Sequence, residues 1–212
     1  PMKNTHDRYG WLSVALHWSM ALAVFGMFAL GVWMRDLSYY DPWYRQGPFI
    51  HKSIGILLLG LLLFRLFWRA INPRPQDAPG MKAWERITAH LTHYALYALL
   101  LVLMLAGYLI STADGRAIDV FGWFSVPATL HGLENQEDIA GEIHEFLAWI
   151  LIILAGVHAA AALKHHFYNR DNTLLKMLSL SRQPRRDPRR HHAPVPRAAT
   201  GARRRRGRAP CR

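Results

Sequence analysis

Four long apolar segments dominate the first 180 residues of this 212-residue chain. An α-helix needs about 20 largely apolar residues to cross the roughly 30 Å hydrocarbon core of a bilayer. The qualifying segments are residues 11–33, 47–68, 91–111 and 143–163. Because short connections join them, neighbouring helices should run antiparallel. The sequence therefore predicts an all-α fold, a transmembrane up-down-up-down four-helix bundle, within a domain of residues 1–180.

The formal net charge of +12 is typical of nucleic-acid-binding proteins, but its distribution argues against such a partner. Residues 181–212 hold 12 of the 26 Lys and Arg residues and a single acid, Asp187. The rest of the chain is nearly neutral, with 14 basic and 13 acidic residues. With little apolar surface to bury, residues 181–212 are predicted to form a disordered Arg-rich cytoplasmic tail. Its nearest partners would be anionic membrane lipids.

Lysine and arginine are concentrated in alternate connections, and this bias marks the cytoplasmic side of a membrane. They precede the first apolar segment, occupy the second connection and follow the fourth segment. The first and third connections hold few of them, and the third is acidic. Both termini of a multi-pass membrane protein are therefore predicted to be cytoplasmic. In a bacterial-type cell the membrane would be the inner (plasma) membrane, and the first and third connections would face the periplasm.

Cysteine chemistry is excluded as the basis of a cofactor site, because Cys211 is the single cysteine and lies in the polar tail. One thiol cannot form an intramolecular disulfide, an iron–sulfur cluster or a zinc finger. The chain also lacks the C-x-x-C-H motif of covalent haem attachment. Metal chemistry must therefore rest on the 12 histidines or on oxygen ligands.

Four of the histidines inside the apolar segments, where ionisable groups are costly and often functional, lie at two matched depths. His17 and His158 lie at similar depths near the predicted cytoplasmic side. His51 and His144 lie within about a turn of the predicted periplasmic ends. His144 and His158 are 14 residues apart, which leaves them about 40° from alignment on one helix face and about 21 Å apart along its axis. Because facing histidines are the usual axial ligands of a b-type haem, we predict two non-covalent haem b sites, one at each depth.

Simpler interpretations of the histidines stay open. A single histidine near a helix end is more often a satisfied polar residue than a ligand. Zinc is the competing metal, but sites so far apart along one helix cannot converge on one tetrahedral ion. His90 and His93 share a helix face and suit alternative ligands, neighbours of a haem propionate or interfacial residues. His165 and His166 suit either lipid headgroup contact or a quinone or propionate contact.

Several stretches between residues 8 and 180 match one known family. They are RYGWLSVALHW from Arg8, HKSIG from His51, AHLTHYALYALL from Ala89, and HEFLAWILIILAGVHAAAALKHHFYNRDNTLLKML from His144. The chain resembles the bacterial cytochrome b-561 family, which comprises di-haem, four-helix inner-membrane proteins related to the cytochrome b subunits of nickel–iron hydrogenases. The resemblance implies that His17 and His158 ligate one haem iron, and that His51 and His144 ligate the other.

Some members of this family resemble superoxide oxidases, in which periplasmic superoxide gives its electron to the haems and ubiquinone accepts it near the cytoplasmic side. The resemblance implies that Lys82 and His165 lie in the neighbourhood of the quinone. The loop around Lys82 departs from the family pattern, and an ordinary lysine of a cytoplasmic connection explains it more simply. Lys52, Arg35 and Arg45 would offer positive charge to superoxide, whereas the acidic third connection works against its capture.

The favoured function is transfer of single electrons between a periplasmic donor and the ubiquinone pool. The chain would then be a superoxide:quinone oxidoreductase or an electron carrier of a respiratory chain. One alternative is a haem-bearing membrane anchor subunit whose redox partner protein is a docked hydrogenase or dehydrogenase. Another is a non-redox membrane scaffold, which would be colourless. The sequence shows no Ser/His/Asp or paired-carboxylate arrangement that would point to hydrolytic catalysis.

Overall fold

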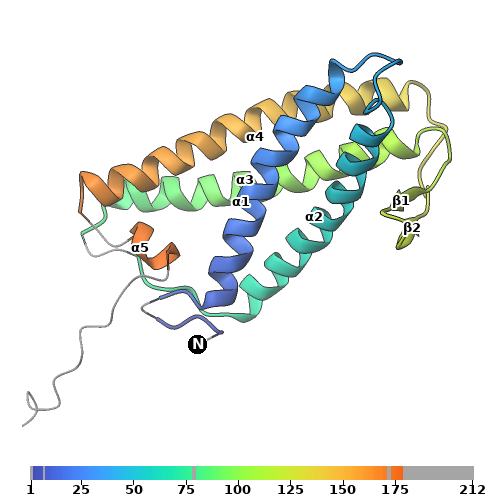
Figure 1. Ribbon diagram of the computed structural model, residues 1–212. Helices are drawn as coiled ribbons and strands as arrows, with labels where there is room; N and C mark the ends of the chain where they lie inside the picture. The colour runs from blue at the N-terminus through green and yellow to red at the C-terminus, as the bar shows by residue number, and fades with distance from the viewer. Residues whose placement is uncertain (1, 7, 78–79, 171–172, 179–212) are drawn as a thin grey trace, which may run out of the picture. The chain divides into compact units, whose positions relative to one another are not determined.

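Four long helices form most of the computed structural model (Figure 1), which describes residues 2–6, 8–77, 80–170 and 173–178. Each helix contains one of the predicted apolar segments and is long and apolar enough to cross a membrane, which confirms the predicted all-α four-helix fold. The four are α1 (Trp11–Arg35), α2 (Gln46–Ile71), α3 (Ala83–Thr112) and α4 (Gln136–Phe167). The shorter elements are β1 (Ile118–Val120), β2 (Phe124–Val126) and α5 (Thr173–Met177).

A small core occupies the centre of the bundle. One buried residue from each long helix meets there: Met20, Leu62, Leu100 and Leu151. The outer faces of the same helices expose many Leu, Phe, Ile and Val side chains. An apolar exterior over a helical backbone that satisfies its own hydrogen bonds is the arrangement that a lipid environment requires.

α3 and α4 begin eight and seven residues before their predicted apolar segments. Hydropathy marks only the part of a helix that lies in hydrocarbon, and polar residues continue both helices beyond it. The Lys82 backbone N–H donates to Glu85 Oε2 at 3.1 Å, which satisfies a donor at the start of α3. Glu137 and Asp138 stabilise the first turn of α4 through the helix dipole. His144 therefore lies eight residues after the start of α4, and not within the single turn expected from the sequence, although its position in the apolar segment is the same.

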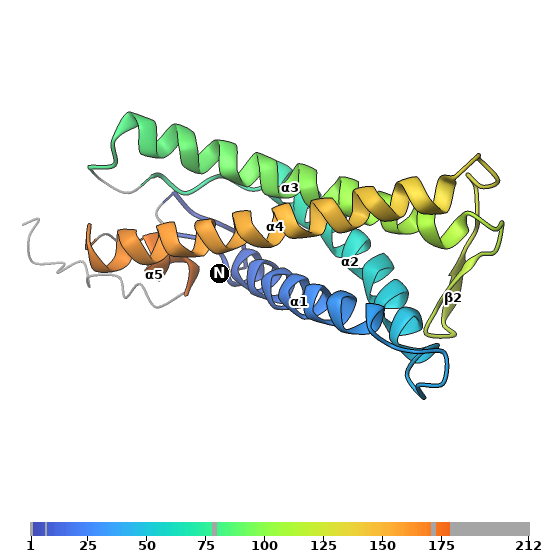
Figure 2. The ribbon, with the colours of Figure 1, turned by 90° about the horizontal axis from the view of Figure 1, so that it is seen from above.

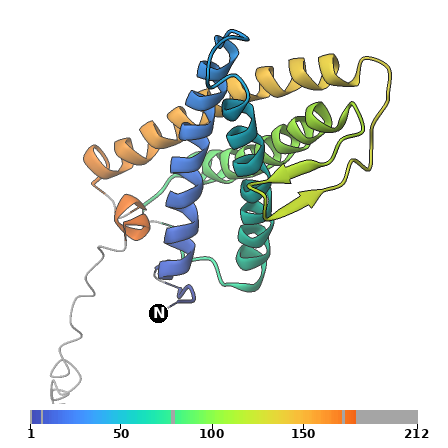
Figure 3. The same ribbon diagram turned by 45° about the vertical axis from the view of Figure 1, so that its right-hand side comes forward.

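The third connection contains a β-hairpin that the hydropathy pattern did not predict. Ile118 pairs with Val126 and Val120 with Phe124, in two antiparallel strands of three residues each. The Ser53 hydroxyl, fully buried on α2, donates to Asp119 O at 3.4 Å and accepts from the Phe121 N–H at 3.3 Å. Ser53 thus ties the hairpin to α2, beside which it lies in Figure 3. Such short strands give no periodic signal in sequence.

The opposite end of the bundle holds the start of α1 together with α5 (Figures 1 and 2). The Trp18 indole N–H donates to Met177 O at 2.9 Å, which joins α5 to α1. Lys176 is 9% exposed, and its Nζ donates to Gln76 O at 2.8 Å, which joins α5 to the second connection. The predicted tail of residues 181–212 lies outside the described residues, so its disorder stays a prediction.

Candidate functional site

The four histidines predicted as haem ligands form two facing pairs at opposite ends of the bundle. His17 on α1 faces His158 on α4, with ring centroids 6.2 Å apart and planes 43° apart. His51 on α2 faces His144 on α4, with centroids 6.1 Å apart and planes 72° apart. Imidazole nitrogens bind metals at about 2 Å, so two rings on opposite sides of one ion have centroids roughly 6 Å apart. Both separations therefore suit a single metal ion between the rings.

A cavity of about 380 Å³ opens beside the His51–His144 pair. Side chains from all four long helices line it, and most of them are apolar, including Phe28, Leu103 and Ile152. Cofactor sites are concave, mostly apolar and carry a few polar groups that fix orientation. The cavity has this character, with His51 and His144 among its polar groups.

The hydrogen bonds of the ring nitrogens differ among these histidines. His144 Nδ1 lies 2.8 Å from Leu103 O, so a proton on Nδ1 would be donated to that carbonyl and Nε2 would be left to bind a metal. The Nδ1 atoms of His17 and His51 are buried and find no hydrogen-bond partner in the described part of the chain. Buried nitrogens without partners are expected where a ligand supplies the missing contact.

Two glycines let neighbouring helices approach the His51–His144 pair. A Cβ atom on Gly31 of α1 would lie 3.2 Å from His51 Cε1. A Cβ atom on Gly107 of α3 would lie 3.0 Å from His144 Cε1. Optimal carbon–carbon contacts are about 3.5–4.0 Å, so either substitution would push a ring from its position. The glycines are thus part of the cradle that places both rings.

A third ring joins the pair at the other end. His93 of α3 packs edge-on against His158, with centroids 5.2 Å apart, and both residues are half-buried. Of the three roles considered for His93, a ligand or a neighbour of the cofactor agrees with this position better than an interfacial residue does. Sequence spacing alone did not reveal this contact, because it depends on how α3 is rotated against α4.

The donor set of each pair fits a haem iron better than a bare metal ion. Within residues 2–178, so far as they are described, no group of three or more His, Cys, Asp or Glu side chains is arranged to hold a metal ion. A haem iron needs only two protein ligands, because the porphyrin supplies four nitrogens. The facing pairs, the apolar cavity and the unpartnered nitrogens together fit this group.

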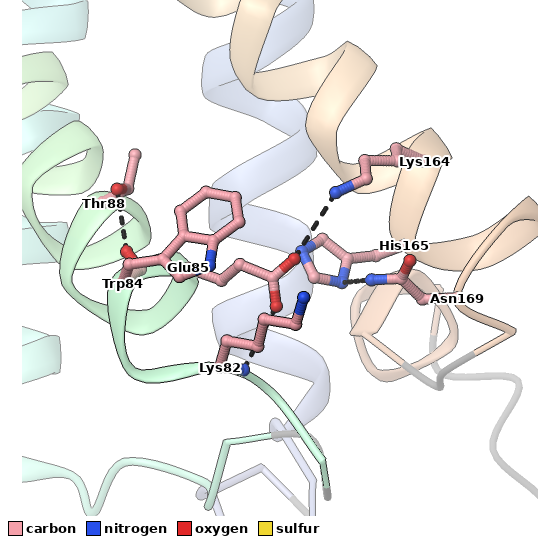
Figure 4. Close-up of polar contacts among 7 residues, drawn as sticks. All are labelled: Lys82, Trp84, Glu85, Thr88, Lys164, His165 and Asn169. Carbon is pink, nitrogen blue, oxygen red and sulfur yellow. Dashed lines mark hydrogen bonds and ion pairs between the residues drawn. The ribbon is translucent and has the colours of Figure 1, made fainter.

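Lys82 and His165 lie at the same end of the bundle, grouped around Glu85 (Figure 4). Glu85 Oε1 accepts a hydrogen bond from Lys164 Nζ at 3.4 Å, which links the start of α3 to the end of α4. Lys164 Nζ also lies 5.8 Å from the centroid of the Trp84 ring. Sequence reasoning missed Glu85 and Trp84 because it placed the start of α3 too late, and it did not pair Lys164 with Glu85. The carboxylate three residues after the N-cap was the available signal.

A smaller pocket of about 270 Å³ lies between the hairpin and the start of α2. Arg45, Lys52 and Arg116 line it together with two acids, Asp114 and Asp119. Lys52, Asp114 and Arg116 also line the cavity of the His51–His144 pair, so the two spaces adjoin. Sequence reasoning selected Lys52, Arg35 and Arg45 as positive charges for superoxide, and it did not include Arg116.

The charges in and around this smaller pocket are partly paired. Arg116 Nε donates to Asp114 Oδ2 at 2.6 Å, and this hydrogen bond holds the pKa of Asp114 below and that of Arg116 above its usual value. Arg35, one of the cations expected to attract superoxide, instead forms an ion pair with Glu145 of α4. Lys52 and Arg45 are thus the predicted cations that do line the pocket.

Four apolar helices that can span a membrane, with facing histidine pairs between them, define a multi-pass membrane cytochrome of the b type. The chain belongs to the prokaryotic cytochrome b561 family, whose model matches residues 8–180. The family resemblance found in the sequence is thereby confirmed, and membership implies binding of haem b and a place in electron transport.

Three named relatives cover most of the chain. Cytochrome b561 homolog 2 of Escherichia coli (strain K12) is 52% identical over 178 residues, which are 84% of this chain and 95% of the relative. Probable superoxide oxidase CybB of Yersinia pestis is 30% identical over 179 residues, 84% of this chain and 99% of the relative. Cytochrome b561 homolog 1 of E. coli (strain K12) is 30% identical over 175 residues, 81% of this chain and 97% of the relative.

Proposed function

We propose that this protein is a di-haem membrane cytochrome that moves single electrons between a periplasmic donor and the ubiquinone pool. His17 and His158 would hold one haem, and His51 and His144 the other. The observation that carries the proposal is the pair of facing histidine arrangements, 6.2 and 6.1 Å between centroids, at opposite ends of one bundle. His144 and His158 are 14 residues apart on α4, which corresponds to about 21 Å along the helix, so the two sites would be stacked across the membrane.

When bound, haem iron supplies reversible one-electron chemistry that no side chain of this protein can supply. The chain's part is to position and insulate that chemistry. Leu103 O orients the His144 ring, and Gly31 and Gly107 leave room for the rings of the same site. Most of the residues that line the 380 Å³ cavity are apolar, and an apolar lining strengthens charge interactions at a bound cofactor.

Superoxide is the donor that the His51 end suits best. The adjoining 270 Å³ pocket carries three cations against two acids, so its net charge favours a small anion. Its connection to the cavity through Lys52 and Arg116 leads toward the His51–His144 pair. The printed name of the Y. pestis relative, probable superoxide oxidase, supports the same donor at 30% identity.

Ubiquinone is proposed to accept electrons near Lys82 and His165. A quinone presents two carbonyl oxygens that accept hydrogen bonds and a flat ring that packs on aromatic surfaces. The end of the bundle in Figure 4 offers lysine and imidazole donors beside the indole of Trp84. The Glu85–Lys164 contact joins α3 and α4 next to these groups.

The orientation in the membrane follows from the charge bias of the connections. Under the proposal both termini are cytoplasmic, in the inner membrane of a bacterium. The start of α1 and α5 lie together at the end that holds Lys82 and His165, in agreement with a cytoplasmic quinone site. The hairpin and its cationic pocket then face the periplasm.

The deciding experiment is superoxide-dependent reduction of ubiquinone by the purified full chain. Two b haems by reduced-minus-oxidised spectroscopy and reduction faster than the protein-free rate are expected. Lys52→Gln should slow reduction by superoxide, whereas His6→Ala, an exposed change outside the helices, should not. A haem-loaded protein without this activity would contradict the superoxide donor. Activity that appears only with a co-purified redox partner would favour the anchor-subunit alternative.

A further inference from the structure

Arg65 is a charged residue inside the span of α2 that points toward the bundle interior. It lies six residues before the end of α2, about 9 Å along the helix, and His17 lies equally far from the start of α1. Arg65 Nη1 contacts Met20 Sδ at 3.6 Å, and Met20 is 2% exposed in the core. A thioether is a weak acceptor, whereas a guanidinium carries five N–H donors, so the described residues satisfy little of the hydrogen-bonding capacity of Arg65.

A second arginine lies one turn further along the same face. The guanidinium carbons of Arg65 and Arg69 both lie 5.5 Å from the centroid of the Tyr97 ring on α3. Like charges four residues apart on a helix repel each other. Neither arginine takes part in any ion pair found among the described residues. Two half-buried cations therefore lie against one aromatic ring, and neither has an ion-pair partner in the part of the chain that the structure describes.

The neighbouring tyrosine does not supply that charge. Tyr9 precedes α1, and burial raises its pKa, an effect that outweighs the opposing charge of Arg69. A phenol with a raised pKa stays protonated at neutral pH. A negatively charged ligand would supply the missing counter-charge. Intramembrane charges of this kind mark functional sites.

The two arginines lie beside the histidine rings at this end. Met20, which Arg65 contacts, is one turn after His17 on α1. His17 faces His158, and His93 packs against His158, so the Met20 contact brings Arg65 to the end of the bundle that holds these three rings. An anion held by Arg65 and Arg69 would therefore adjoin the space between His17 and His158.

We propose that Arg65 and Arg69 bind the two propionate carboxylates of the haem held by His17 and His158, with Tyr97 as their platform. This inference rests on the proposed function. Haem carries two carboxylates, which balance the two guanidinium charges, and the planar fork of arginine matches a carboxylate in a bidentate manner. A lipid phosphate shares this chemistry, but the contact of Arg65 with the buried Met20 favours a ligand inside the bundle.

The test compares Arg65→Gln and Arg69→Gln with Arg74→Gln in the full chain. Arg74→Gln is the control because it removes the same charge near the same helix end. The Arg74 guanidinium contacts the hydroxyl of the exposed Tyr94 at 3.5 Å. Each of the first two variants should release the haem of the His17 site about ten- to a hundredfold faster, as expected for the loss of a charge-assisted bond. The midpoint potential of that haem should also fall, because positive charge stabilises the reduced form. Arg65→Lys should restore the midpoint potential of that haem more fully than its retention, because lysine keeps the charge but cannot bind a carboxylate in a bidentate manner.

The haem of the His51 site serves as the internal folding control, since its retention and potential should stay unchanged in every arginine variant. Equal haem retention and equal potential in Arg65→Gln, Arg69→Gln and Arg74→Gln would overturn the inference. Loss of bound phosphatidylglycerol without any change at the haem would overturn it in favour of lipid. Failure of the proposed function gives a different result, because wild-type protein would then hold no haem that depends on His17.

Discussion

The two histidine pairs have nearly equal ring separations but different surroundings. At the His51–His144 pair, a backbone carbonyl holds one ring, two glycines fit against the rings, and a hairpin fixed by Ser53 closes the end. At the His17–His158 pair, a third histidine and two arginines surround the rings, and α5 and the Glu85–Lys164 contact close the end. The first end suits a small anionic donor, and the second suits an acidic cofactor edge and a quinone.

The largest effect expected from this comparison concerns His93 and His158. His158→Ala should remove one of two haems, because it deletes an axial ligand, whereas His93→Ala should keep both and weaken retention only at the His17 site. Haem stoichiometry from the pyridine haemochrome spectrum measures this. Loss of a full haem in His93→Ala, with retention in His158→Ala, would show that His93 is the ligand.

A second prediction concerns the glycine cradle at the other end. Gly107→Ala should displace the His144 ring, since its Cβ would lie 3.0 Å from Cε1, and overpacking of this kind costs about 1–3 kcal/mol. Haem retention should fall at the His51 site alone. The matched control is Gly60→Ala, where the new Cβ meets nothing within 4 Å. Equal retention in the two alanine variants would show that Gly107 has no role in placing the ring.

These glycines show where sequence reasoning reached its limit. The depth and spacing of His17, His51, His144 and His158 were visible in sequence, because helix periodicity converts spacing directly into position. The contacts of Gly107 and of Arg65 were not, because they depend on the rotation of each helix against its neighbours. The hairpin was missed for a different reason: Ile118 and Val120 alternate with an exposed residue, but three residues are too short a strand to give a periodic signal in sequence.

A third prediction tests the hairpin as the closure of the His51 end. Ser53→Ala removes both contacts of a fully buried hydroxyl and should lower the free energy of unfolding by about 1 kcal/mol. Amide hydrogen exchange should accelerate in residues 118–126 and stay unchanged in α5. Ser19→Ala, on an exposed face of α1, is the control. Unchanged exchange in the hairpin would mean that Ser53 does not hold it.

The smallest effect concerns the charge of the donor pocket. Asp114→Asn should free Arg116 from its ion pair and raise the rate of superoxide capture at low ionic strength, with the gain lost at high salt. Arg116 lowers the pKa of Asp114, so the Asp114–Arg116 ion pair is fully formed above the ordinary pKa of Asp. It is lost only when the pH falls through the lowered pKa and Asp114 is protonated. Stopped-flow rates at two salt concentrations measure this. A slower or salt-independent rate in Asp114→Asn would contradict an electrostatic role for the pocket.

The central claim is that each facing histidine pair holds its own haem. Its most direct test is the number of haems per chain, together with reduced-minus-oxidised spectra, in wild-type protein, His17→Ala and His51→Ala. The account predicts two haems in wild type and one in each variant, with the two variants retaining spectrally different haems. A colourless wild-type protein, or two variants that lose the same haem, would contradict it.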